Sequence, residues 1–139
     1  MYDTILVPVD LSHNPSGAKA IKIAKKLIND GGDIILLNVF SDVPAYIEAE
    51  LGKDLQYMRE NQKKEVLQQL TGLAKDNGIG SSVQVLSGHA ASSILEAAEE
   101  QNADLIIIAS HRPGLSDYFL GSTAARVVRH AQCPVLVDR

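Results

Sequence analysis

The chain has 139 residues, which is enough for one domain, and 45% of them are hydrophobic, so it can bury a substantial core. Only 4% of the residues are aromatic and none is tryptophan, which leaves aliphatic side chains to fill that core, as in a parallel sheet covered by helices. A net charge of -4 without a dense basic block argues against DNA or RNA as the main partner, although one local patch of cations would suffice for a nucleotide.

The first part of the chain predicts two buried strands separated by a helix. Residues 4–9 are almost entirely apolar and predict the first strand. Asn14, which is followed by a proline, can cap a helix, because proline is tolerated at the first helical position. Apolar residues then recur at helical spacing until Gly31 and Gly32, which are expected to end the helix. Residues 33–40 predict the second buried strand.

The middle of the chain predicts a longer helix followed by a strand at the edge of the sheet. Residues 41–52 contain a proline and predict a loop or a short irregular helix. Helical spacing returns at residues 53–76, and the Asn77-Gly78 pair is expected to end that helix. Residues 82–86 alternate between polar and apolar, which is typical of a strand that is wet on one side.

The last part of the chain contains the most apolar strand. Residues 92–100 predict a short helix, and residues 105–109 are so uniformly apolar that we expect a central strand, covered on both faces. A long loop follows at residues 110–120. A final helix is expected at about residues 121–131, and residues 134–137 predict the last strand.

Strands therefore alternate with helices along the whole chain, which indicates a single α/β domain spanning residues 1–139. Right-handed crossovers between parallel strands favour a Rossmann-like open sheet of five strands in the order 3-2-1-4-5, with helices on both faces. In this order the direction of winding changes between the first and fourth strands. Ligands of open α/β sheets bind at such a point, beyond the carboxyl ends of the strands.

Three candidate binding groups fall on the loops that flank this point. Asp10 could accept a hydrogen bond from a ribose or an adenine amino group, or it could simply form a turn with its own backbone. The turn from Gly121 to Thr123 opens the last helix, where amide groups without helical partners attract anions, although an ordinary serine cap would look the same. Arg112 could pair with phosphate oxygens or could be a solvated surface residue.

Several other kinds of site lack support in the sequence. The single cysteine, Cys133, precedes a buried strand and is best explained as a small buried hydrophobe, and the histidines lack the spacing of metal ligands. There is no Walker A loop and no nucleophile elbow. With no signal peptide and no apolar run near the ~20 residues that span a bilayer, we expect a cytoplasmic protein without a membrane partner.

The chain resembles the universal stress protein family, and the resemblance covers essentially its whole length. It rests on TILVPVDLS near the start and on residues 105–139, where a Leu-Gly-Ser turn precedes Val-Val-Arg-His-Ala and Cys-Pro-Val-Leu-Val. The ATP-binding branch of this family has two spaced glycines before a Gly-Ser or Gly-Thr turn. The first two glycines fall here on Ala109 and Arg112, whereas Gly121-Ser122 is intact. The Ser-His-Arg-Pro loop is similar to that of the F and G types, which are regarded as nucleotide binders.

This resemblance implies ATP, or else ADP or AMP, as the ligand, with Mg2+ bound through the phosphates. The residues that it places around the nucleotide are Pro8, Val9, Asp10, Val39, Ile108, Ala109, His111, Arg112, Gly121, Ser122, Thr123 and Ala124. It also implies a homodimer that forms through the last strand, at residues 134–138.

Three hypotheses about function follow. The first is a nucleotide-binding regulatory protein of the stress response, in which residues 41–57 could act as a partial lid. The second is a slow ATPase or a self-phosphorylating enzyme, although the sequence shows no evident arginine finger, general base or Walker-type lysine for fast transfer. The third is a dimeric interaction protein with an empty pocket, which the missing glycines would suit.

Overall fold

The computed structural model describes residues 1–11, 14–40, 44–80, 82–110 and 120–139. Five strands alternate with four helices in these ranges, and the strands form one parallel sheet in the order β3-β2-β1-β4-β5, as expected. The elements are β1 (Tyr2–Pro8), α1 (Asn14–Leu27), β2 (Ile28–Phe40), α2 (Ala45–Asp76), β3 (Ser82–Ser87), α3 (Ala90–Glu100), β4 (Leu105–Ala109), α4 (Ser122–His130) and β5 (Val135–Asp138).

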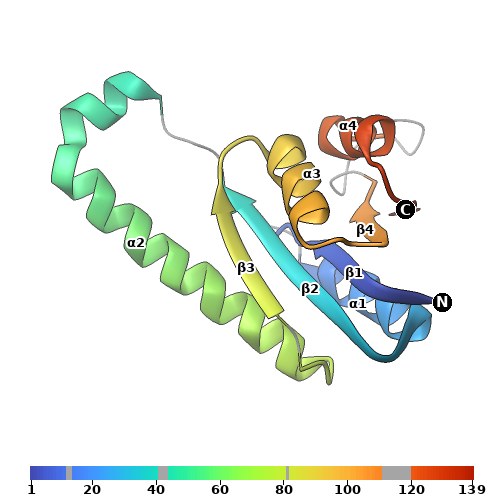
Figure 1. Ribbon diagram of the computed structural model, residues 1–139. Coiled ribbons are helices and arrows are strands. Elements are labelled where there is room, and N and C mark those ends of the chain that lie inside the picture. The colour runs from blue at the N-terminus through green and yellow to red at the C-terminus, as the bar shows by residue number, and fades with distance from the viewer. Residues whose placement is uncertain (12–13, 41–43, 81, 111–119) are drawn as a thin grey trace.

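Two apolar clusters lie on the two faces of this sheet, because successive side chains of each strand point to opposite faces. One cluster joins alternate residues of the central strands, such as Ile5 and Ile107, to α1 and α2. The other joins the residues in between, such as Leu6 and Ile106, to α3 and α4. The two pairs of helices therefore cover opposite faces (Figure 1). β4 is buried from Leu105 to Ile108, which confirms its central position.

The junction between α1 and β2 differs from the expectation that Gly31 and Gly32 would end the helix. α1 ends at Leu27, and Ile28 already pairs with Tyr2 of β1. The register then shifts before the regular pairing resumes, and Gly31 has a φ of 79°, a left-handed conformation that glycine adopts without strain. The two glycines therefore belong to an irregular start of the strand, which long-range pairing with β1 selects.

α2 is longer than expected, because it begins at Ala45 and absorbs most of the segment expected to be irregular. It is interrupted at Gly52, whose φ of 48° and ψ of -118° are not helical. The turns before this break extend beyond the sheet (Figure 1), and they and the residues just after it expose Tyr46, Tyr57 and Met58. Although α2 has 32 residues, no helix in the described part of the chain is long and apolar enough to cross a membrane.

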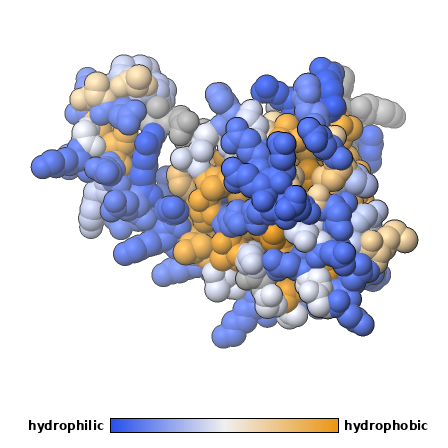
Figure 2. Space-filling view, viewed as in Figure 1, coloured by the Kyte–Doolittle hydropathy of each residue, from blue (hydrophilic) through white to orange (hydrophobic). Residues whose placement is uncertain are grey.

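Hydrophilic side chains cover much of the face seen in Figure 2, and hydrophobic surface appears between them.

At the amino ends of the central strands, the carboxylate of Asp104 accepts hydrogen bonds from the backbone N–H groups of Asp3 at 2.9 Å and Thr4 at 3.0 Å. Desolvation acts to raise the pKa of Asp104, but these bonds and the nearby N-terminal ammonium outweigh it and lower that pKa. Asp104 thus stabilises the start of β1 as an anion.

Candidate functional site

The backbone of Ser110 joins three elements at the carboxyl edge of the sheet. Ser110 directly follows β4 and is 3% exposed. Its N–H donates to the carbonyl oxygen of Asp138 in β5 at 2.8 Å, and its own carbonyl oxygen accepts from the N–H of Gly121 at 2.6 Å. The start of α4 is therefore held directly against the end of β4.

α4 begins with the amide groups that a phosphate would need. Gly121 is its N-cap, with a φ of -57° and a ψ of 152°, and no side chain caps the helix among the described residues. The N–H groups of Ser122, Thr123 and Ala124 have no acceptor within the helix. Because the N–H of Gly121 is already bonded to Ser110, this residue cannot offer its own amide, and as a glycine it places no side chain at the start of the helix.

The side chains of this first turn have different environments. Ser122 is exposed and Thr123 is half-buried, so both hydroxyl groups lie at or near the surface. Ala124 is only 2% exposed and packs into the cluster under α3 and α4. Of the residues expected to hold phosphates, Ala124 can therefore contribute its backbone amide only.

The opposite side of the site is formed where β1 leaves the sheet. The pairing of β1 with β2 ends at Pro8 and Leu37, and the N–H of Val9 then donates to the carbonyl oxygen of Leu37 at 2.7 Å. Val9 is 5% exposed, so its position is fixed by the core. Asp10 follows at the surface, where it also interacts with other parts of the protein.

Strands β1, β2 and β4 bring the remaining expected residues to the same edge. The register of β1 with β4 pairs Ile5 with Leu105, and its continuation brings Val9 level with Ala109. Val39 lies near the end of β2, and its side chain packs on the face that also holds Ile108. Ten of the twelve expected site residues thus lie at the carboxyl edge, near the change of winding direction. The other two, His111 and Arg112, lie outside the described residues.

Two residues that were not among the predicted site residues, Ser110 and Asn38, shape this edge. The side-chain Nδ2 of Asn38 donates to the carbonyl oxygen of Val9 at 2.9 Å. Each was detectable as a polar residue that follows an uninterrupted apolar stretch of a buried strand. Such a residue must find a hydrogen-bond partner, and for the side chain of Asn38 this partner is the backbone of the site.

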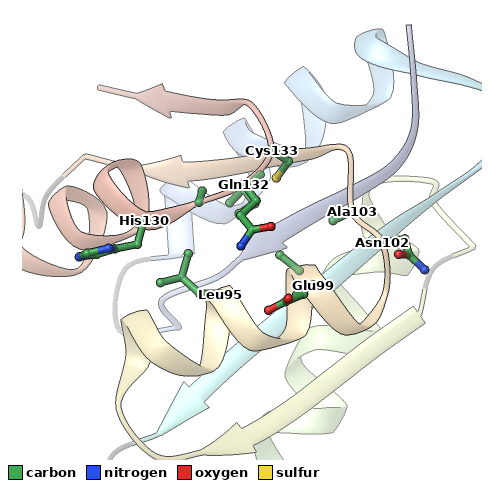
Figure 3. A pocket seen from close by; sticks show the side chains of 10 residues that line it. Leu95, Glu99, Asn102, Ala103, His130, Gln132 and Cys133 are labelled. Carbon is green, nitrogen blue, oxygen red and sulfur yellow. The ribbon is translucent and has the colours of Figure 1, made fainter.

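A separate hollow lies at the other end of the sheet, before β4 and β5 begin (Figure 3). It has a volume of about 210 Å³, and Figure 3 shows Leu95 and Gln132 reaching into the space between α3 and the start of β5. None of the expected site residues lines it. Cys133 lines it and is half-buried rather than fully buried. Burial raises the pKa of its thiol, which favours the protonated form.

Among the described residues, no group of three or more histidine, cysteine, aspartate or glutamate side chains could hold a metal ion. Asp138, at the end of β5, forms an ion pair with Lys19 of α1 at 3.0 Å. The carboxylate is 12% exposed, and this pairing reduces the negative charge at the edge where α4 begins.

Comparison with known proteins gives a consistent result over the full length of the chain. Residues 1–139 match the model of the universal stress protein family. Universal stress protein G of Escherichia coli O157:H7 is 34% identical over 100% of both chains. The solved structure of the hypothetical protein MJ0577 is similar with a TM-score of 0.80 and 25% identity, covering 99% of this chain and 95% of that one. A universal stress protein in complex with cAMP has a TM-score of 0.67 and 22% identity, covering 99% and 97%.

Proposed function

Since the chain belongs to the universal stress protein family, we propose that it binds an adenine nucleotide, ATP in the first place, at the carboxyl edge of its sheet. The observation that carries this proposal is the start of α4, where three amide groups without helical partners lie beside the end of β4. The nucleotide would act as a regulatory ligand in a stress response rather than as the substrate of a fast enzyme.

The phosphates would bind at the first turn of α4. The positive end of the helix dipole and the N–H groups of Ser122 to Ala124 favour an anion there, and a glycine at the N-cap lets it approach the backbone. The hydroxyl groups of Ser122 and Thr123 are near enough in sequence to add donors. Mg2+ would be held mainly by the phosphates, because it keeps several waters and prefers phosphate oxygens as ligands.

The purine would bind at the end of β2. Residues two apart in a strand direct their backbone groups to the same side, and Leu37 directs its carbonyl group to β1. The N–H and C=O groups of Val39 therefore point to the side where β1 has already ended. An adenine ring offers an acceptor at N1 and a donor at N6, which match these two groups.

The relative solved with cAMP supports a nucleotide in this fold, because cAMP also combines an adenine with a phosphate. Its identity of 22% limits that support to the architecture. The residues of this chain carry the rest of the argument, and they include no glycine at position 109, where Ala109 is half-buried.

We further propose a homodimer that pairs through β5. The carbonyl oxygens of Pro134 and Asp138 accept bonds from the β4 side, so the backbone groups of Val135 and Val137 point outward from this edge of the sheet. All four residues of the strand are half-buried, and three are apolar. A short apolar edge strand of this kind can pair with a second copy of itself across a twofold axis.

The proposal is tested by identifying the nucleotide that the protein carries. Purified protein is denatured, and any released small molecule is identified by mass spectrometry. We expect an adenine nucleotide in the parent and much less in Gly121→Val, because the valine side chain would occupy the proposed phosphate position at the start of α4. Calorimetric titration of the nucleotide-free parent with ATP and magnesium should give saturable binding. A parent that releases no nucleotide and shows no binding at millimolar ATP would contradict the proposal.

A further inference from the structure

Asn38 is a polar residue placed where β2 has been apolar for four residues. The stretch from Ile34 to Leu37 is buried, and Asn38 is half-buried directly after it. Its backbone pairs with Val85 of β3, and its side chain lies on the face covered by α1 and α2, because Leu36 belongs to that face. An amide side chain here must be satisfied by the protein.

The side chain of Asn38 finds its hydrogen-bond partner where the pairing of β1 with β2 ends. In a regular parallel ladder, the N–H of Val39 would be the next group to reach the carbonyl oxygen of Val9. The pairing ends before this step, and the oxygen of Val9 accepts from Nδ2 of Asn38 at 2.9 Å. The side chain thus occupies the position of a backbone donor.

We propose that Asn38 is a positioning residue of the nucleotide site. By binding the carbonyl oxygen of Val9, it keeps the backbone N–H of Val39 directed to the space beyond β1, where a base can accept it. This inference rests on the proposed nucleotide binding and adds a residue that determines which base is preferred. Asn38 does not contact the nucleotide and acts only through Val9 and Val39.

The consequence is selectivity for adenine over guanine. Adenine presents an acceptor at N1 and a donor at N6, whereas guanine presents a donor at N1 and an acceptor at O6. The N–H and C=O groups of Val39 can therefore bond adenine but would oppose guanine bound in the same orientation. If Val39 turned its N–H to Val9, the bond to N1 would be lost, whereas the phosphate contacts at α4 would not change. Loss of Asn38 should thus reduce the preference for ATP over GTP.

The test compares ATP and GTP binding by calorimetry in the parent and three variants. Asn38→Leu should weaken ATP binding about tenfold, which is the effect on affinity of losing one hydrogen bond, and should leave GTP binding nearly unchanged. Asn38→His should restore most of the preference, because its Nδ1–H is attached to Cγ as the Asn amide is. The matched control is Asn77→Leu, which removes a similar bond, from Nδ2 to the carbonyl oxygen of Leu73 at 2.8 Å, far from the site.

An equal loss of ATP and GTP affinity in Asn38→Leu, or the same change of preference in Asn77→Leu, would overturn the inference. Hydrogen exchange on the protein without nucleotide provides an independent outcome. We expect the amide of Val39 to exchange faster than that of Leu37 in the parent and more slowly in Asn38→Leu. Equal protection of Val39 and Leu37 in the parent would refute the role of Asn38. Open exchange at Val39 without any ATP binding would refute only the proposed function.

Discussion

Replacing Ser122 by aspartate should change the stability of the protein and its affinity for nucleotide in opposite directions. Ser122 is the first residue of α4 and is exposed. A carboxylate in the first turn interacts favourably with the helix dipole, by about 0.3–1 kcal/mol. We therefore expect the unfolding temperature without nucleotide to stay the same or to rise.

The same carboxylate would oppose a bound phosphate. Two like charges about 4 Å apart repel by about 1 kcal/mol in water and by about 4 kcal/mol near a protein surface. Because Ser122 is exposed, the lower half of this range applies, and we expect ATP to bind about five- to seventyfold more weakly. Calorimetric titration measures this loss, and thermal melting without nucleotide measures the stability.

Two controls separate charge from structure. Ser122→Asn has a similar shape without the charge and should bind ATP nearly as the parent does. Ser92→Asp places the same charge in the first turn of α3, at the same edge of the sheet but beside β3. It should stabilise its helix and leave ATP binding nearly unchanged. If Ser122→Asp binds ATP as tightly as Ser122→Asn, then the phosphates are not at α4 and the reasoning is wrong.

Three further predictions concern packing, pH and assembly. Gly17→Val should lower the free energy of unfolding in urea by about 1–3 kcal/mol, because a Cβ at Gly17 already meets side chains at 3.0 and 3.1 Å. Gly72→Ala should raise it by up to about 1 kcal/mol, because a Cβ at this helical glycine meets nothing within 4 Å. The pKa of Asp104 is lowered in the folded protein, so its contribution to stability is complete above about pH 4 and is lost as the pH falls further. Asp104→Asn should therefore be less stable than the parent at pH 6, and the difference in stability between the two should be smaller at pH 3. Val137→Pro removes an N–H that points away from β4, so sedimentation should show a dimer for the parent and a folded monomer for the variant. A variant that remains a dimer would exclude pairing through β5.

The sequence was sufficient for the fold because its main signals are local. Apolar runs without polar interruption, such as residues 105–109, favour buried strands, and their alternation with helical spacing leaves few topologies. The start of α4 was also predictable, since a Gly-Ser pair is typical of a helix start, and Gly121 is the N-cap and Ser122 the first residue of α4. These features depend on neighbours in the sequence and not on the rest of the fold.

The errors arose where distant parts of the chain decide the structure. Pairing of Ile28 with Tyr2 ends α1 before the glycines that looked like its stop signal. The use of the Gly121 amide by Ser110 depends on how the end of β4 meets α4, which no local pattern encodes. The role of Asn38 likewise depends on where β1 leaves the ladder, a detail set by the whole sheet.

A crystal structure of the protein with saturating ATP and magnesium tests the central claim most directly. We expect phosphate oxygens within hydrogen-bonding distance of the amides of Ser122 and Thr123, and the adenine against the backbone of Val39. A nucleotide found instead in the hollow between α3 and the start of β5, or a carboxyl edge that stays without nucleotide at saturation, would contradict the account.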